Sequence, residues 1–158
     1  MSKFIPNERS KVYFAVGHED YNSLAVSDFT SAVELTDLLI SINASSQGNM
    51  VPTPNIGSLF ETSIPGTVQA ALSADFYRDD DPTKDVAWNT LPRGTEGAFF
   101  INRIGIAGEE PAAGDNFEVW PAMIVSRTMS NMSSNTAATF TVQCSVPEEP
   151  VESVAVSS

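Results

Sequence analysis

The chain has 158 residues, 42% of them hydrophobic and 9% aromatic, which suits one domain with a buried core. Its 20 acidic and 8 basic residues give a net charge of −12, which argues against a surface that grips nucleic acid or an anionic membrane by releasing counterions. The N-terminal segment lacks a signal peptide's apolar stretch, no run reaches membrane-spanning length, and a single cysteine excludes an intrachain disulfide, so we expect a soluble protein made in the cytosol.

The first eleven residues are locally basic although the whole chain is acidic. Residues 1–11 carry a net charge of +2, from Lys3, Arg9 and Lys11 against Glu8. This segment is either a frayed terminus or an arm that docks on an acidic neighbour. The stretch at 11–16 then predicts a first strand, which ends at Gly17.

Two different signals occupy residues 29–44. The sequence from Ser31 to Glu34 fits a capping box, which predicts a helical turn that begins near 29–31. The alternation over 38–44 predicts a strand, because one helix over 31–44 would have no continuous apolar stripe.

Residues 47–66 contain three prolines and three glycines and show little periodicity, so we expect a long loop. Its apolar side chains would be exposed unless they cover another surface. The loop either folds back on its own core or orders against a partner subunit, and we favour the partner. The apolar residues concerned are Met50, Val51, Ile56, Leu59, Phe60 and Ile64.

A strand and a short helix are predicted next. Apolar side chains alternate over 68–77, as in a half-buried strand. Asp81 and Pro82 then resemble the cap and first residue of a helix, which ends before Pro92. So short a helix must lie on the sheet, and Trp88 and Leu91 are its expected anchors.

Three further segments complete the predicted sheet. Residues 97–106 are apolar on both faces, so that strand must be covered both by the sheet core and by something else. The next strand, 116–127, contains Pro121, which marks an edge or a bulge. Residues 136–146 alternate without a break, and Cys144 points inward as a small core residue rather than a nucleophile.

Little in the sequence supports an enzyme. His18 lies in an exposed-looking turn far from Cys144, so the two make a poor nucleophile–base pair. The glycines match no phosphate-binding loop, and no zinc-ligand spacing occurs. The carboxylates at 79–81 lack the donor spacing of an EF-hand and fit a solvated turn before a helix. We therefore expect no catalytic site, no metal and no cofactor.

The second half of the chain carries short motifs in a fixed order. They are ADFYRDD at 74–80, DVAW at 85–88 with Leu91, RGTEG at 93–97, GD at 114–115 and FEVWP at 117–121. Together they resemble the major tail protein, or tail tube protein, of long-tailed bacteriophages. The resemblance covers roughly residues 28–146 and is sharpest over 68–127.

This resemblance implies a fold and an assembly. The expected fold is mainly β, a small antiparallel β-sandwich or partly closed barrel with one short flanking helix. Six copies would form a ring, and hexameric rings would stack into a tube through which DNA leaves the capsid. Further partners would be the tape measure protein and the tail initiator and terminator proteins. The subunit would be made in the host cytoplasm and reside in the virion tail.

The resemblance also gives roles to particular residues. A neighbouring subunit would supply the second cover of the strand at 97–106 and a surface for the loop at 47–66. The candidate subunit-interface residues are Met50, Val51, Ile56, Leu59, Phe60, Ile64, Phe99 and Ile101. A six-subunit ring would carry six times −12, or −72, and an acidic wall would repel DNA so that it slides.

The predicted domain spans residues 1–146, with the arm at 1–11 and an assembly loop at 47–66. A flexible acidic tail follows at 147–158.

Two rival functions remain. The first is a tail terminator or head–tail connector, which forms a single ring. The second is a β-sandwich module that binds a glycan or peptide, in which exposed aromatic residues such as Trp120 or Tyr77 would line a groove.

Overall fold

The computed structural model describes residues 10–57, 60, 62–130 and 134–158, and within them the chain is mainly β. The prediction of a mainly β fold is confirmed, with two short helices instead of one. In chain order the elements are β1 (Lys11–Val16), β2 (Leu24–Ala25), α1 (Val26–Ser31), β3 (Val33–Glu34), β4 (Leu39–Pro52), β5 (Ser63–Tyr77), α2 (Val86–Thr90), β6 (Glu96–Asn102), β7 (Asn116–Met129), β8 (Thr139–Ser145) and β9 (Val151–Ser157).

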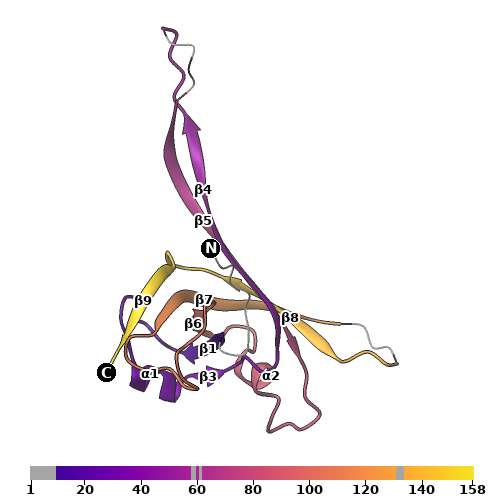
Figure 1. Cartoon of the computed structure of the whole chain (residues 1–158). Helices are drawn as coiled ribbons and strands as arrows, with labels where there is room; N and C mark the ends of the chain where they lie inside the picture. The colour runs from indigo at the N-terminus through magenta and orange to yellow at the C-terminus, as the bar shows by residue number, and fades with distance from the viewer. Residues whose placement is uncertain (1–9, 58–59, 61, 131–133) are drawn as a thin grey trace, which may run out of the picture.

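The strands form one sheet in the order β3-β1-β6-β7-β8-β5-β4, with antiparallel neighbours, and the described part of this sheet is not closed into a barrel. β9 pairs with the start of β7 and, in parallel, with β2. Two hairpins project from the body, β4–β5 and β7–β8, and the first is much the longer (Figure 1). Strands that are neighbours in sequence pair at these hairpins, whereas the pairings of β1 with β6, of β5 with β8 and of β2 with β9 join distant parts of the chain.

Pro121 lies where β7 can accommodate it. Along one edge of β7, the pairing with β9 ends at Val119 and the pairing with β8 begins at Met123. A proline cannot donate a ladder hydrogen bond, so it fits in the gap between two partner strands. The predicted edge or bulge at this residue is therefore a change of partner strand.

The sheet separates two hydrophobic clusters. The first contains Phe99 and Ile101 of β6, together with side chains of β5, β8 and α2. The second contains Ala98 and Phe100 of the same strand and is covered by α1, β2 and β9. The double cover of residues 97–106 thus comes from the chain itself. Phe99 and Ile101 are 0% and 2% exposed, so assigning them to a subunit interface was wrong.

The predicted loop at 47–66 is wrong for most of its length, because β4 continues to Pro52 and β5 begins at Ser63. The pairing of β4 with β5 shifts register between Gly48 and Met50, so the alternation that reveals a strand breaks there. Proline is tolerated at a β-bulge, and Pro65 lies next to this register shift, directly opposite Met50.

The predicted flexible tail at 147–158 is also wrong over most of its length. Residues 151–157 form β9, in which Val154 and Val156 alternate with exposed positions and are buried in the second cluster. Its backbone pairs with β7 and β2, so the end of the sequence is part of the fold.

Both short helices are offset from their predicted places. α1 ends at Ser31 instead of beginning there, and its capping carboxylate is Asp28, which accepts a hydrogen bond from the Ala25 N–H at 2.8 Å. Asp81 closes a turn by accepting from the Thr83 N–H at 2.9 Å, and α2 begins later, at Val86.

The sequence RGTEG at 93–97 needs its two glycines for different reasons. Gly94 has a φ of +91°, which side chains rarely adopt. Gly97 lies so close to β1 that an added Cβ would be 2.2 Å from the Ala15 carbonyl oxygen. One glycine permits the turn, and the other lets β6 pair tightly with β1.

Candidate assembly surface

His18 and Cys144, which the sequence analysis weighed as a nucleophile–base pair, lie in different parts of the protein. The His18 ring packs edge-on against Phe100, with 5.0 Å between ring centroids, beside the second cluster. Cys144 is half-buried against the first cluster, where desolvation raises its thiol pKa to about 12. The structure therefore places Cys144 as a core residue and does not bring the two together.

The carboxylates at 79–81 form a hydrogen-bonded turn. Asp79 accepts from the Asp81 N–H at 2.8 Å, and Asp81 accepts from both the Thr83 backbone and hydroxyl. The hydrogen bond from the Thr83 hydroxyl is the main cause that lowers the Asp81 pKa. Among the described residues, no three side chains of metal-ligating type gather in one place. These hydrogen bonds explain why the aspartates gather in this turn, and no bound ligand is needed to explain it.

Trp88 lies between two arginines. Its ring stacks against the Arg78 and Arg127 guanidiniums at 3.8 and 3.6 Å, and its edge meets Phe140 with the centroids 5.2 Å apart. Arg127 also donates a 2.7 Å hydrogen bond to the Trp88 carbonyl. Leu91 is fully buried, whereas Trp88 is half-buried. Both predicted anchors therefore pack α2 against the sheet, and Trp88 does so with charged partners.

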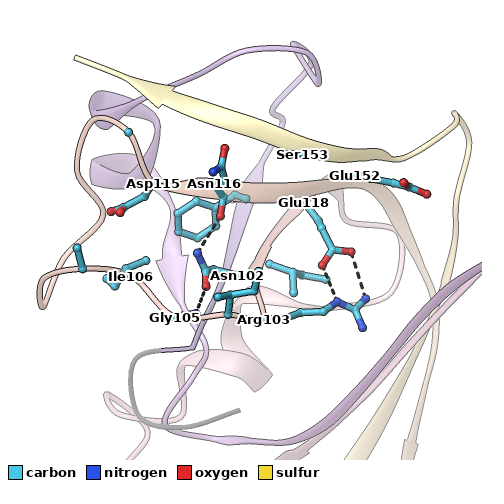
Figure 2. A pocket seen from close by; sticks show the side chains of 14 residues that line it. Asn102, Arg103, Gly105, Ile106, Asp115, Asn116, Glu118, Glu152 and Ser153 are labelled. Atoms are coloured by element: carbon cyan, nitrogen blue, oxygen red, sulfur yellow. Dashed lines mark hydrogen bonds and ion pairs between the residues drawn. The ribbon is translucent and has the colours of Figure 1, made fainter. Parts of the chain in front are cut away.

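A pocket lies between the β6–β7 connection and the start of β9 (Figure 2). Its floor is held by Asn102, which donates to the Asn116 carbonyl at 2.8 Å and accepts from the Gly105 N–H at 2.5 Å. Among the described residues, no buried side-chain nitrogen or oxygen lacks a partner. The polar groups here secure the connection, and nothing in the pocket calls for a ligand.

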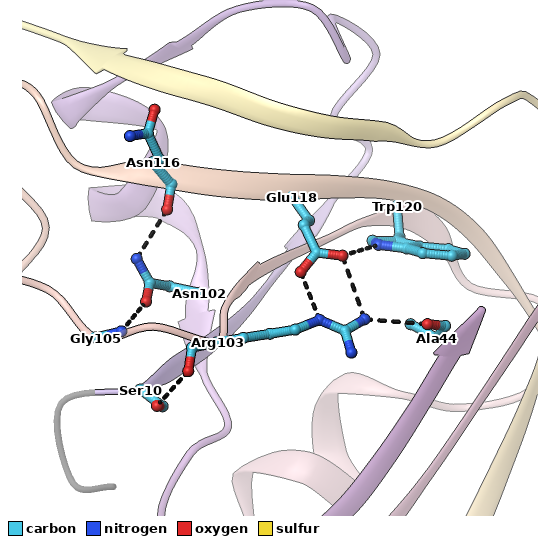
Figure 3. Close-up of polar contacts among 8 residues, drawn as sticks. All are labelled: Ser10, Ala44, Asn102, Arg103, Gly105, Asn116, Glu118 and Trp120. Carbon is cyan, nitrogen blue, oxygen red and sulfur yellow. Dashed lines mark hydrogen bonds and ion pairs between the residues drawn. The ribbon is translucent and has the colours of Figure 1, made fainter. Parts of the chain in front are cut away.

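Arg103 at the pocket's edge links the body to the long hairpin (Figure 3). It pairs with Glu118 of β7 and donates a 3.0 Å hydrogen bond to the carbonyl of Ala44 in β4. Glu118 also accepts from the indole N–H of Trp120 at 3.2 Å. Trp120 is 3% exposed, so it cannot line a glycan groove. This network instead fixes the root of the hairpin.

The outer half of the β4–β5 hairpin exposes the largest set of apolar side chains described. Met50 is 76% exposed and Ile56 is fully exposed. Directly paired residues lie on one face of a ladder, so Val51 and Ile64 form an apolar pair. The exposed set on this hairpin is Met50, Val51, Ile56, Phe60, Ile64 and Val68, while the predicted Leu59 lies outside the described residues.

Val68 was missed in the sequence because its strand position predicts a buried side chain. It lies on the same face as the buried Leu72, but it is 57% exposed because β5 has already left the body there. Strand length is the signal that could have found it, since the 15 residues of β5 span about 50 Å, more than a small body can cover.

A family model described as phage tail tube protein matches residues 1–158. The chain belongs to the phage tail tube protein family. The family shown by this match is the one that the motifs at 74–121 predicted. This tail tube protein is therefore a structural protein of the phage tail, located in the virion. Among its described residues, no helix is long and apolar enough to cross a membrane.

Solved structures similar to this tail tube protein share its fold at low sequence identity. The tail of an empty gene transfer agent particle, refined with C6 symmetry, gives a TM-score of 0.58 at 13% identity, covering 94% of this chain and 98% of that one. The native gene transfer agent virion gives 0.55 at 14%, covering 93% and 97%. The six-fold symmetrised baseplate of the anti-feeding prophage gives 0.56 at 11%, covering 96% and 98%. No curated protein sequence matches the chain.

Proposed function

We propose that six copies of this tail tube protein form a ring, and that rings stack into the tube through which DNA passes. The observation that carries the proposal is the β4–β5 hairpin, which projects from a complete core with its apolar side chains exposed (Figure 1). The similar tail and baseplate structures described with six-fold symmetry support the ring size.

The edge of the sheet also supports assembly. β4 is 14 residues long and lies at the end of the strand order, with β5 as its neighbour. Monomeric proteins protect such edges with lysine, inward charges or short strands, but β4 contains no charged residue, and its one proline, Pro52, is its last residue. A neighbouring copy would satisfy the free backbone groups by strand pairing and bury the apolar side chains of the hairpin.

The remaining partners and the lack of catalysis follow from the same role. A tube of this kind needs a tape measure protein, an initiator from which it grows and a terminator that ends it. The subunit would have no catalytic function and no cofactor, because assembly and passage of DNA need shape and surface rather than bond chemistry.

Removal of the outer hairpin tests the proposal. Gln47 and Gln69 pair directly, so replacing residues 48–68 with Asn-Gly should close a short hairpin and spare both clusters. We expect a folded monomer that forms no tubes, measured by circular dichroism, sedimentation and negative-stain electron microscopy. The double substitution Val51→Ser and Ile64→Ser keeps the strands and should weaken assembly in part.

The wild-type chain, concentrated under the same conditions, is the reference and should form hollow tubes with a regular axial repeat. Tubes of normal appearance from the shortened variant would contradict the proposal. A closed ring that never stacks would favour a terminator or connector instead.

A further inference from the structure

β4 ends the strand order of the described chain, so one side of its backbone faces β5 and the other side is an open edge. In an antiparallel ladder, alternate residues turn both their N–H and their C=O toward the same side. The Ala44 carbonyl accepts a hydrogen bond from Arg103, which lies outside β5, so Ala44 belongs to the set that faces the open edge. The pairing with β5 is regular over 41–48, so Ile42 and Ser46 also turn their backbone groups outward.

The Arg103 side chain is held against this edge from several directions (Figure 3). Its guanidinium pairs with Glu118 through two hydrogen bonds, at 2.5 and 3.2 Å, and donates to the Ala44 carbonyl at 3.0 Å. Glu118 also accepts from the indole N–H of Trp120, and the Arg103 carbonyl accepts from the Ser10 hydroxyl at 3.0 Å. Because a bidentate pair restricts the direction of the guanidinium, the fold itself determines its position beside β4.

The guanidinium and an added strand cannot occupy the same part of the edge. The next strand of a sheet would lie about 4.8 Å from β4 and would bond to its outward carbonyls. Arg103 already occupies that place, 3.0 Å from the Ala44 oxygen. A strand that crossed Ala44 would have to displace the guanidinium and break a charge-assisted hydrogen bond, whereas a strand that ends before Ala44 would leave this bond intact.

The sequence of β4 beyond Ala44 leaves the register of an added strand poorly determined. Register is strongly specified where one face is buried, and it slips in strands that are polar on both faces. Residues 45–49 read Ser-Ser-Gln-Gly-Asn, without an apolar or charged side chain, and all five are exposed. These side chains distinguish one register from the next only weakly, so a fixed stop at the root of the hairpin would be the stronger constraint.

We propose that Arg103 is a stop for strand addition: a strand from a neighbouring copy pairs with β4 along the hairpin and ends at Ala44, which fixes its register. This inference rests on the proposed function, from which it takes the pairing of neighbouring copies, and it adds the residue that limits how far the pairing extends. Arg103 is thus a positioning residue for assembly. Without its donors, the edge would be open down to Ile42.

Amide exchange along the β4 edge tests the proposal. Arg103→Met keeps an unbranched apolar side chain and removes every donor, and Arg93→Met makes the same change at an exposed arginine in the turn before β6. Hydrogen–deuterium exchange, resolved to single residues, is measured in monomers and in tubes at the N–H groups of Ile42 and Ser46, which lie on either side of Ala44. Circular dichroism and urea unfolding first establish that each monomer is folded.

In wild-type and Arg93→Met tubes we expect the Ser46 amide to exchange roughly tenfold more slowly than in the monomer, or slower still, and the Ile42 amide to keep its monomer rate. In Arg103→Met tubes both amides should be slowed. Slow exchange at Ile42 in wild-type tubes, or a monomer rate there in Arg103→Met tubes, would overturn the proposal. A folded Arg103→Met monomer that forms no tubes would make Arg103 part of the subunit contact and would overturn its role as a stop.

Further outcomes separate this proposal from the proposed function. Wild-type tubes that protect neither amide would overturn the stop and leave the tube intact as the function. Absence of tubes from the wild-type chain would overturn the proposed function, and the stop with it. If Arg103→Met misfolds, Arg103→Gln takes its place in the same comparison, because its amide can still donate to Glu118 but is too short to hold both partners.

Discussion

At the residue scale, Cys144 shows how burial controls a reactive group. Desolvation raises its pKa from 9.0 to about 12, so the folded protein keeps the thiol protonated where the unfolded chain has lost the proton. The stabilising effect is therefore complete below pH 9 and is lost as the pH rises toward 12.

We predict that the wild-type protein loses stability relative to Cys144→Ala by up to about 1 kcal/mol per pH unit above pH 9. Urea denaturation of both proteins across this range measures the difference, and the substitution removes only the titrating group. A difference that does not change with pH would contradict the prediction. Ellman's reagent should also react slowly with the folded protein and readily once urea has unfolded it.

Single residues were predicted well where their role depends on local sequence. The inward position of Cys144 follows from the alternation over 136–146, and Gly94 fits a turn by its sequence alone. The reason for Gly97 could not be predicted, because the carbonyl that approaches it belongs to Ala15, about eighty residues earlier. Close contact between distant strands leaves no local signature.

At the element scale, α2 is too short to be stable by its own hydrogen bonds, so its packing must hold it. Trp88 provides much of that packing through Phe140 and the two arginines that enclose its ring. Asp85, at 3% exposure, holds Arg78 in place with a 2.8 Å ion pair. The position of α2 thus depends on the Trp88 ring, on the arginines that stack against it and on the ion pair between Arg78 and Asp85.

We predict that Trp88→Ala lowers the free energy of unfolding by roughly 2–4 kcal/mol, from lost burial and two lost cation–π contacts. Trp88→Phe keeps an aromatic face and should lose clearly less. Denaturant unfolding followed by circular dichroism measures both variants. Equal losses would mean that the ring's stacking between the arginines contributes nothing.

Strands could be predicted from the sequence where apolar and polar residues alternate without a break. The strands at 11–16 and 139–145 were found because their alternation is regular and their ends are marked by turns. The long hairpin was missed because its register shift interrupts the alternation near Gly48. β2 and β3 have two residues each and carry no period, since their distant partners determine them.

At the scale of the whole molecule, the family and the mainly β fold were predictable, but the placement of surfaces was not. The sequence shows that residues 97–106 need two covers, yet only the three-dimensional structure shows that α1 and β9 supply the second one. The row of polar side chains formed by Asn43, Ser73, Gln143 and Ser126 likewise exists only in the register of β4, β5, β8 and β7, and its members lie up to about one hundred positions apart in the chain.

The place of β9 also has a consequence for the order in which the protein is made. Val154 and Val156 complete the second cluster, and the Ser157 hydroxyl bonds to the Leu24 carbonyl, 133 positions earlier. Synthesis must therefore pass Ser157 before the strands that emerged first have their full cover, and such distant pairing folds slowly. A ribosome that stops early would release a chain with an open core beside an unprotected β4 edge, which is a substrate for chaperones and proteases rather than a building block.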